Sequence, residues 1–291
     1  MQEPLVSVII PAYNHEKFIQ ETIESIVNQT YQHIELTVID DGSKDLTYKI
    51  LQLLQKKFQT RFVRFHIETQ ENSGTCTTLN KLLSLAQGKY LYLIASDDKA
   101  RPECIKLETD FLENNTEYAL CVGNNEFIDI NSQKCYVADS SLSPKSNFEE
   151  GDFRNFASYL EYYHQFSFKS NIFGTYKKLF TGNHIPNGYL FRKDIFQKIG
   201  MFTTEAPLED YWLMLQISKY WKIKYLNRIL FSYRLHGANT SYQREKMLIM
   251  TGKTLKYEIN LLLSLPDEEL SEDAREVKEN LIAQMKNAST R

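Results

Sequence analysis

The segment Leu5-Val-Ser-Val-Ile-Ile10 is a short apolar run, rich in β-branched residues, that ends at Pro11. Runs of this kind are typical of strands buried on both faces of a parallel sheet. Two similar runs follow, Ile34-Glu-Leu-Thr-Val-Ile39 and Tyr90-Leu-Tyr-Leu-Ile-Ala95, with helical patterns between them. The alternation of strand and helix patterns over the first hundred residues predicts an α/β fold built on a doubly wound, mostly parallel sheet.

The other elements are predicted from the spacing of apolar residues. In the first part of the chain we expect helices over 19–27, 46–54 and 79–86, and a further strand over 62–67. The middle, from about residue 132 to 187, has no such period and is expected to form long loops and short helices. Periodic structure resumes over 189–199, followed by a helix over 209–221 and short strands over 223–226 and 229–233. Beyond Gln243 we expect two amphipathic helices, separated at Pro266.

Composition and charge limit the classes of function. The 291 residues are 42% hydrophobic and 24% charged, as in a soluble globular protein. The net charge of -3 argues against nucleic acid as a partner. Four cysteines show no CxxC spacing and follow no secretory leader, which predicts reduced thiols in a cytoplasmic protein: Cys76, Cys104, Cys121 and Cys135.

The sequence also bears on membranes. No apolar stretch reaches the roughly 20 residues that a spanning helix needs. Aromatic and lysine side chains over 159–180 and an apolar face over 248–262 motivate the hypothesis of peripheral association with the inner face of the cell membrane. The same aromatic mixture also suits a sugar-binding cleft or a packed core. The last helices either cap the domain or pair with a second chain, so the oligomeric state stays open.

Polar residues gather at three predicted strand ends. Pro11-Ala-Tyr-Asn14, Asp40-Asp41 and Asp97-Asp98 each follow an apolar run directly. In a doubly wound sheet, ligands bind beyond the carboxyl ends of the strands, so these residues are expected to converge on one crevice. Adjacent carboxylates at such a position predict a site for a divalent cation, whereas a lone Asp-Asp pair would equally suit surface charge.

These motifs, taken in order, resemble the inverting family 2 glycosyltransferases of the GT-A fold, of the type that assembles bacterial glycans. The resemblance runs from Val6 to Ser241 and is carried by Val6-Ser-Val-Ile-Ile-Pro-Ala-Tyr-Asn14, Ile39-Asp-Asp-Gly-Ser43, Asn72-x-Gly74 with Asn80, Gly88-Lys-Tyr90, Ser96-Asp-Asp98, Glu209-Asp210 and Tyr233-Arg-Leu-His236. It implies a GT-A domain over 1–242, with a nucleotide-binding half to about residue 130 and an acceptor half from about 131 to 242. Residues 243–291 would then form a C-terminal helical extension.

The resemblance also implies roles for individual residues. Asp98 and His236 are the expected ligands of Mn²⁺ or Mg²⁺, and Asp210 is the expected catalytic base. The predicted contacts to the donor nucleotide are Pro11, Tyr13, Asn14, Asp41, Asp97 and Arg234, with Asp41 on the uracil N3–H, Asp97 on the ribose or the metal, and Arg234 on phosphate. The family often carries Asp-x-Asp where this chain has Ala95-Ser96-Asp97-Asp98, so the first acid of that pattern is missing. Considered alone, Asp41 and Asp210 also suit ordinary acids at the start of a helix.

The function implied is transfer of a hexose or N-acetylhexosamine from a UDP-sugar to a hydroxyl of a saccharide acceptor, with inversion. The expected acceptor is a lipid-linked or surface glycan, such as O-antigen, lipooligosaccharide, capsule or an N-glycan precursor, including one carried on polyprenyl diphosphate. One alternative is a sugar-phosphate nucleotidyltransferase, but its glycine- and arginine-rich phosphate loop is absent near the first strand. The other is a degenerate sugar-nucleotide-binding scaffold without transferase activity, which would have no need of the base.

Overall fold

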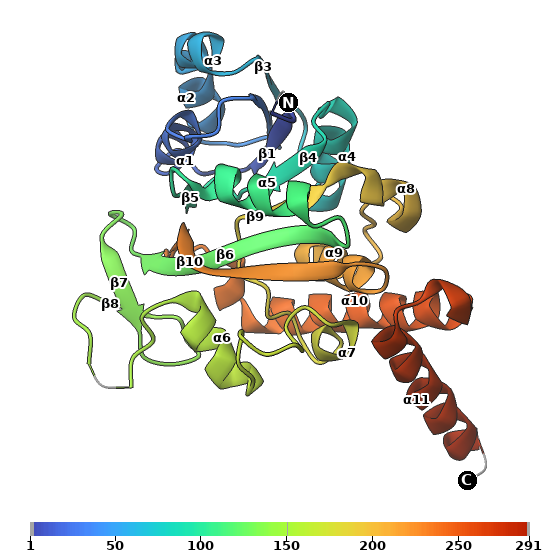
Figure 1. Cartoon of the computed structure of the whole chain (residues 1–291). Coiled ribbons are helices and arrows are strands. Elements are labelled where there is room, and N and C mark those ends of the chain that lie inside the picture. Colours follow the sequence, from blue (N-terminus) through green and yellow to red (C-terminus); the bar gives the residue numbers. More distant parts are fainter. Residues whose placement is uncertain (1–2, 150, 290–291) are drawn as a thin grey trace.

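A mixed, mostly parallel sheet runs through the computed structural model, which describes residues 3–149 and 151–289 (Figure 1). Its strands are β1 (Val6–Ala12), β2 (Ile34–Asp40), β3 (Arg64–Thr69), β4 (Tyr90–Leu93), β5 (Lys99–Ala100), β6 (Tyr118–Ile128), β7 (Lys134–Val137), β8 (Pro144–Lys145), β9 (Tyr189–Arg192) and β10 (Lys222–Arg234). The strand order is β3-β2-β1-β4-β9-β6-β10-β5, and β7 and β8 extend from β6 as a small side sheet. The strands from β3 to β4 are parallel to one another, whereas β9 runs antiparallel to both of its neighbours.

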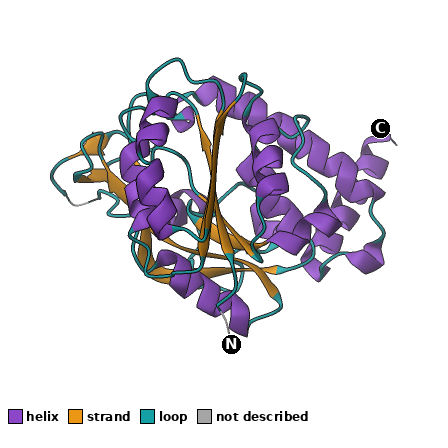
Figure 2. Ribbon diagram, turned by 90° about the horizontal axis from the view of Figure 1, so that it is seen from above, coloured by secondary structure: helices purple, strands orange, loops and turns teal. Residues whose placement is uncertain are grey.

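Helices cover both faces of this sheet, as the view from above shows (Figure 2). They are α1 (Ile19–Val27), α2 (Thr47–Leu53), α3 (Gln55–Arg61), α4 (Thr75–Leu85), α5 (Cys104–Asn114), α6 (Phe156–His164), α7 (Tyr176–Leu179), α8 (Phe196–Ile199), α9 (Glu209–Ser218), α10 (Arg244–Ser264) and α11 (Glu272–Ser289). Short 3-10 turns lie at Lys193–Ile195, Thr240–Tyr242 and Asp267–Glu269. The predicted doubly wound, mostly parallel α/β sheet with C-terminal helices is therefore confirmed.

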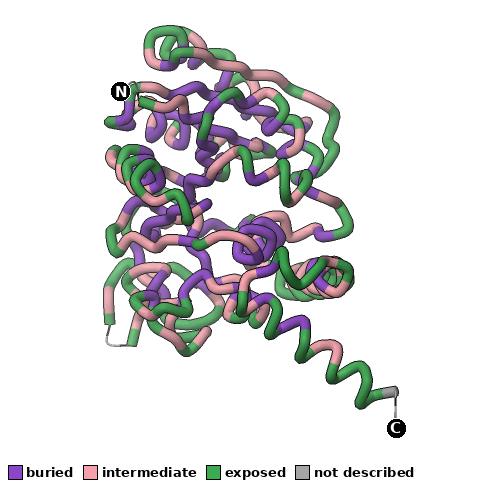
Figure 3. The backbone as a smooth tube through the Cα atoms, turned by 45° about the vertical axis from the view of Figure 1, so that its right-hand side comes forward, coloured by how far each residue is buried: buried purple, intermediate pink, exposed green. Residues whose placement is uncertain are grey.

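Two hydrophobic clusters, one on each face, hold the layers together. The side chains of β1 alternate between them, because successive residues of a strand point to opposite faces: Val8 and Ile10 join the cluster under α1, α2, α3 and α5, and Ile9 joins the other. The second cluster includes apolar residues of α4, α6, α7 and α9, and also Leu262 of α10 and Ala274 of α11. The C-terminal helices thus share this core, although the far end of α11 projects outward and is largely exposed (Figure 3). The domain limits expected from the sequence stay a prediction.

Several predicted boundaries need correction. The two short strands expected over 223–226 and 229–233 form one strand, β10, with irregular register against β6 near Tyr225 and Ile229. The segment 189–199 is a strand followed by short helices, and the helix expected to reach residue 221 ends at Ser218. The third strand begins at Arg64 rather than at Phe62. None of the helices in the described part of the chain is long and apolar enough to cross a membrane.

Candidate active site

A cavity of about 490 Å³ lies at the carboxyl ends of β1 and β4, where the sequence predicted the crevice. One wall carries Pro11 at the end of β1 and the pair Asp97 and Asp98 after β4. The same cavity is lined by Glu209 and Asp210, the first residues of α9. Two acidic pairs, from segments more than a hundred residues apart in the chain, therefore meet at one cavity.

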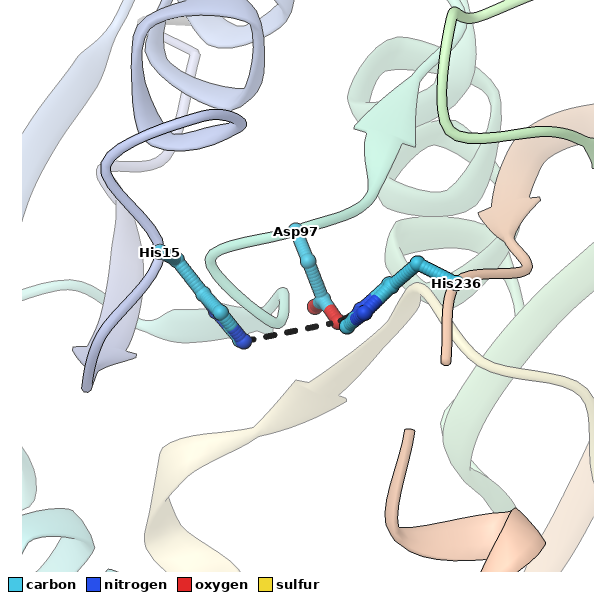
Figure 4. Close-up of side chains that lie close together, drawn as sticks. All are labelled: His15, Asp97 and His236. Atoms are coloured by element: carbon cyan, nitrogen blue, oxygen red, sulfur yellow. Dashed lines mark hydrogen bonds and ion pairs between the residues drawn. The ribbon is translucent and has the colours of Figure 1, made fainter. Parts of the chain in front are cut away.

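The side chains of His15 and His236 converge on that of Asp97 (Figure 4). His236, which follows β10, places Nε2 2.8 Å from Asp97 Oδ2, and His15, in the loop after β1, places Nε2 3.8 Å from the same oxygen. One ligand atom from each of the three residues lies within 4.8 Å of the others. The Nδ1 atom of His15 lies 2.7 Å from Ser96 Oγ, which fixes the ring with its other nitrogen toward Asp97.

This group fits a divalent cation. Two imidazole nitrogens and a carboxylate oxygen form a donor set that Mn²⁺ accepts. Ligand atoms held at right angles about 2.1 Å from an ion lie about 3 Å apart, which is close to the spacing of His236 and Asp97. The contact of His15 with Ser96 is also of the kind that orients metal-binding histidines. His15, Asp97 and His236 are thus the residues that would hold the ion.

The predicted ligand pair of Asp98 with His236 stays a prediction, although the geometry places Asp97, rather than Asp98, beside His236. The Oδ1 atom of Asp98 instead accepts a hydrogen bond from the backbone N–H of Arg234 at 2.8 Å. Burial, together with the neighbouring charge of Asp97, raises the pKa of Asp98 well above its usual range. Asp98 still lines the cavity.

The predicted phosphate contact of Arg234 stays a prediction, but the hydrogen bonds of its side chain do not favour it. Its side chain is fully buried, does not line the cavity and donates hydrogen bonds inside the protein. Its Nε donates to the backbone oxygen of Asp97 at 2.6 Å, and its two terminal nitrogens donate to Ser132 Oγ at 2.8 Å and Glu21 Oε2 at 2.7 Å. Arg234 therefore positions the loop after β4.

The other predicted nucleotide contacts lie at the ends of β1 and β2. Asn14 has a left-handed backbone (φ 53°), and its Oδ1 accepts a hydrogen bond from Lys44 N at 2.8 Å. Asp41 is held against Ala12, and its carboxylate accepts hydrogen bonds from Ser73 N at 2.9 Å and from Gly74 N at 3.0 Å.

Burial raises the pKa of Asp41, but hydrogen bonds led by that from Gln70 outweigh it and leave the pKa below its usual value. The side chain of Tyr13 is 45% exposed. Pro11 and Asp97 line the cavity, whereas Tyr13, Asn14 and Asp41 lie beside it, so their contacts to a nucleotide stay predictions.

Asp210, the predicted base, also lines the cavity. Asp210 Oδ1 accepts a hydrogen bond from Tyr211 N at 2.6 Å, and Oδ2 accepts one from Asn183 Nδ2 at 3.2 Å. Burial raises the pKa of Asp210 above its usual value, and burial with the charge of Asp210 raises the pKa of Glu209 to about 8. The two adjacent carboxyls therefore keep a proton to higher pH than isolated carboxyls do.

The sequence predictions missed three residues of this cavity. His15 is an isolated histidine in a loop and Asn183 lies in the segment without periodicity, so neither carries a recognisable signal. Lys246 is the one Lys or Arg side chain among the described residues that line the cavity, and it lies on the first turn of α10. The sequence did contain a signal for Lys246, because a basic residue lies in the first turn of the helix that follows His236.

Comparisons with known proteins identify the family of the chain. A family model described as glycosyl transferase family 2 matches residues 7–199. An "uncharacterized glycosyltransferase" of Haemophilus influenzae is 31% identical over 258 residues, which are 88% of this chain and 73% of that protein. The hyaluronan synthase of Pasteurella multocida is 27% identical over 242 residues, 83% of this chain but only 21% of that protein.

A solved structure shows the same fold. The structure of S. aureus TarS 1-349 in complex with UDP-GlcNAc superimposes with a TM-score of 0.62 at 18% identity, and the match covers 91% of this chain and 68% of that chain. At this identity the likeness concerns the fold alone. Because the family model covers residues 7–199 and a relative is 31% identical over 88% of the chain, the chain belongs to glycosyl transferase family 2.

Proposed function

We propose that the chain is an inverting glycosyltransferase that transfers a hexose or N-acetylhexosamine from a UDP-sugar to a hydroxyl of a saccharide acceptor, with Mn²⁺ or Mg²⁺ bound. The observation that carries the proposal is that one cavity is lined both by Asp210 and by His15 and Asp97, which form a cluster of possible metal ligands with the neighbouring His236. TarS was solved with UDP-GlcNAc, and the synthases among the relatives are named for hyaluronan and chondroitin. These names support a UDP-sugar donor and a glycan product.

In an inverting transfer, a base removes the proton of the acceptor hydroxyl as that oxygen attacks the anomeric carbon from the side opposite the diphosphate. Asp210 is the carboxylate for this step. Its Oδ2 faces Asn183 and its Oδ1 is held by Tyr211 N, so the group has a fixed orientation at the cavity wall. Glu209, with its pKa near 8, remains protonated and adds no second negative charge near the reacting centre.

The leaving diphosphate binds beside the His15, Asp97 and His236 group. A bound divalent cation would stabilise the negative charge that develops on the leaving group. Lys246 adds a permanent positive charge at the same cavity, and no ion pair engages it within the described residues. The N-terminal end of α10, which begins at Arg244, contributes further positive potential through its unpaired N–H groups.

Replacing His236 by Ala is expected to abolish the gain in UDP affinity that Mn²⁺ provides. The substitution removes the imidazole nearest to Asp97 and leaves a single histidine beside the carboxylate. Calorimetric titration with UDP, with and without Mn²⁺, measures this directly, because the metal-dependent part of the affinity should vanish while the metal-independent part remains. The readout is binding and does not depend on turnover.

Two further variants assign the ligands. His15→Ala should weaken the metal-dependent affinity, whereas Glu24→Ala, an exposed carboxylate on α1, serves as the matched control and should not. If Asp98→Ala removes the metal dependence and Asp97→Ala does not, the ion is held by the residue predicted from the sequence and the geometric assignment fails. A wild-type protein that binds no UDP under any condition would overturn the proposed activity.

The acid limb of the pH profile of kcat/KM is expected to move to higher pH when Asn183 is replaced by Ala. The Asn183 amide donates a hydrogen bond to Asp210 and so lowers the pKa of that carboxyl, against the upward effect of burial. Without the donor, the pKa of Asp210 rises, the base is protonated over a wider acidic range, and activity recovers only at higher pH. Steady-state rates measured across pH test this, and Asn187→Ala, another asparagine of the cavity, is the control. An unshifted limb in Asn183→Ala would show that a different group sets it.

A further inference from the structure

Three tyrosines of α6, here called the tyrosine platform, lie at one edge of the catalytic cavity: Tyr159, Tyr162 and Tyr163. The side chain of Tyr162 is 66% exposed and that of Tyr163 is 42% exposed, while Tyr159 is partly buried. Figure 1 shows α6 beneath β6 and β10, on the side of the sheet where α7 and α10 also lie. Large aromatic side chains are costly to leave in water, and three on one short helix indicate a surface that another molecule covers.

The platform is continuous with the cavity. Phe156 and Leu160, on the same helix, line the cavity that contains Asp210. From Phe156, a chain of ring contacts leads outward: its ring is parallel to that of Tyr159 at 5.9 Å between centroids, and Tyr159 contacts Tyr163 at 4.7 Å. Tyr163 in turn meets Tyr162 edge to face at 5.1 Å. Aromatic rings therefore extend without a break from the wall of the catalytic cavity to the protein surface.

The hydroxyl groups of the platform are available to a ligand. Within residues 3–149 and 151–289, the phenolic oxygens of the three tyrosines have no hydrogen-bond partner. The rings are nevertheless fixed, since Phe153 packs against all three at centroid distances of 5.4, 5.4 and 5.9 Å. A rigid tyrosine offers a flat apolar face and a polar tip at a low cost in conformational entropy. A pyranose has the matching form, with C–H bonds on its faces and hydroxyls around its edge.

We propose that the tyrosine platform binds the acceptor glycan, holding the sugar residue next to the one whose hydroxyl reaches Asp210. This inference rests on the proposed transferase function and specifies its acceptor: a saccharide of at least two residues rather than a monosaccharide. The first residue enters the cavity beside Phe156 and Leu160, and the second stacks on Tyr163 and Tyr162. Stacking on the platform contributes to acceptor affinity and leaves donor binding unchanged.

The chemistry of α6 favours a glycan over a lipid surface. A helix that lies on a bilayer pairs its apolar side chains with Lys and Arg that attract anionic head groups. The α6 sequence, Phe-Ala-Ser-Tyr-Leu-Glu-Tyr-Tyr-His, has neither, and it carries the acidic Glu161. Exposed aliphatic side chains occur instead on α10, at Leu248 and Ile249, and these provide the comparison for a membrane.

The test applies the labelled chain of 291 residues, with UDP and Mn²⁺ present, to an array of bacterial surface oligosaccharides that includes the corresponding monosaccharides. Wild type should be retained on glycans of two or more residues, and the double variant Tyr162→Ala with Tyr163→Ala should lose at least about tenfold of that signal. Tyr163→Phe, which keeps the ring, should retain most of it. Leu53→Ala, with a side chain 72% exposed on α2, is the control and should bind as wild type does.

The outcomes separate the platform from the proposed function. Titration with UDP, and unfolding by urea, should give the same values for wild type and the double variant. If wild type binds UDP but no array glycan, or if the double variant keeps its glycan signal, the platform inference is overturned and the transferase proposal stands. The double variant and Leu248→Ala are also compared for sedimentation with anionic phospholipid vesicles. If the double variant no longer sediments with them and keeps its glycan signal, the platform binds a membrane instead. If wild type binds no UDP, the transferase proposal itself fails.

Discussion

Replacing Asp210 by Asn is expected to lower kcat by roughly 10²- to 10⁴-fold while UDP affinity stays as in wild type. The amide keeps the size of the side chain and an oxygen to accept the hydrogen bond of Asn183, but it cannot take a proton from the acceptor hydroxyl. Because Asp210 is not a member of the His15, Asp97 and His236 group, its replacement leaves the proposed site of the donor diphosphate unchanged. Release of UDP from the donor in the presence of acceptor measures kcat, and calorimetric titration measures UDP affinity.

Glu209→Gln is the matched control for this prediction. Both carboxylates open α9 and both line the cavity, but the raised pKa of Glu209, about 8, makes it the protonated member of the pair at neutral pH. Its replacement by an uncharged amide should therefore cost much less activity than Asp210→Asn. A larger loss in Glu209→Gln than in Asp210→Asn would move the catalytic base to Glu209.

The parts of the fold that the sequence predicted are those with local signals. β1, β2 and β4 are short apolar runs ended by Pro11 or by acids, and α1 and α4 show a clear apolar face, so each element could be recognised without its partners. The long strand β6 and the antiparallel β9 were missed, because their place in the sheet depends on pairing with β10 and β4. Such pairing joins residues far apart in the chain and leaves no periodic pattern.

The candidate site divides in the same way. Asp97, Asp98 and Asp210 were found because they follow recognisable strand or helix signals and match family motifs. Which of two adjacent aspartates faces His236 depends on the course of the loop after β4, and Arg234 fixes that course from inside the protein. A basic residue next to a predicted ligand resembles a phosphate contact in the sequence, and its burial becomes evident only in three dimensions.

Replacing Glu258 by Ala is expected to destabilise the protein by roughly 3–5 kcal/mol. Glu258 of α10 is fully buried and forms an ion pair with Lys219, an equally buried residue at the end of α9. Lys219 Nζ lies 3.0 Å from Glu258 Oε1. The Glu258 carboxylate also accepts hydrogen bonds from Tyr176 Oη at 2.6 Å and Gln216 Nε2 at 2.7 Å. Burial lowers the pKa of Lys219, whereas the charge of Glu258 and its hydrogen bond raise it. Without Glu258, the buried ammonium of Lys219 has no counter-charge. The shift of the midpoint of urea denaturation measures this loss in the free energy of unfolding.

Two comparisons show whether this loss comes from an unpaired buried charge. The exposed pair of Lys177 and Glu276 likewise joins a C-terminal helix to the body of the protein, but Glu276→Ala should cost only about 0–1 kcal/mol because water already screens both charges. The double variant Lys219→Met with Glu258→Leu should recover most of the stability lost in Glu258→Ala, since apolar side chains of similar size can replace a buried ion pair. If the double variant is as unstable as Glu258→Ala, the hydrogen bonds from Tyr176 and Gln216, rather than the ion pair, hold α10 against α7 and α9.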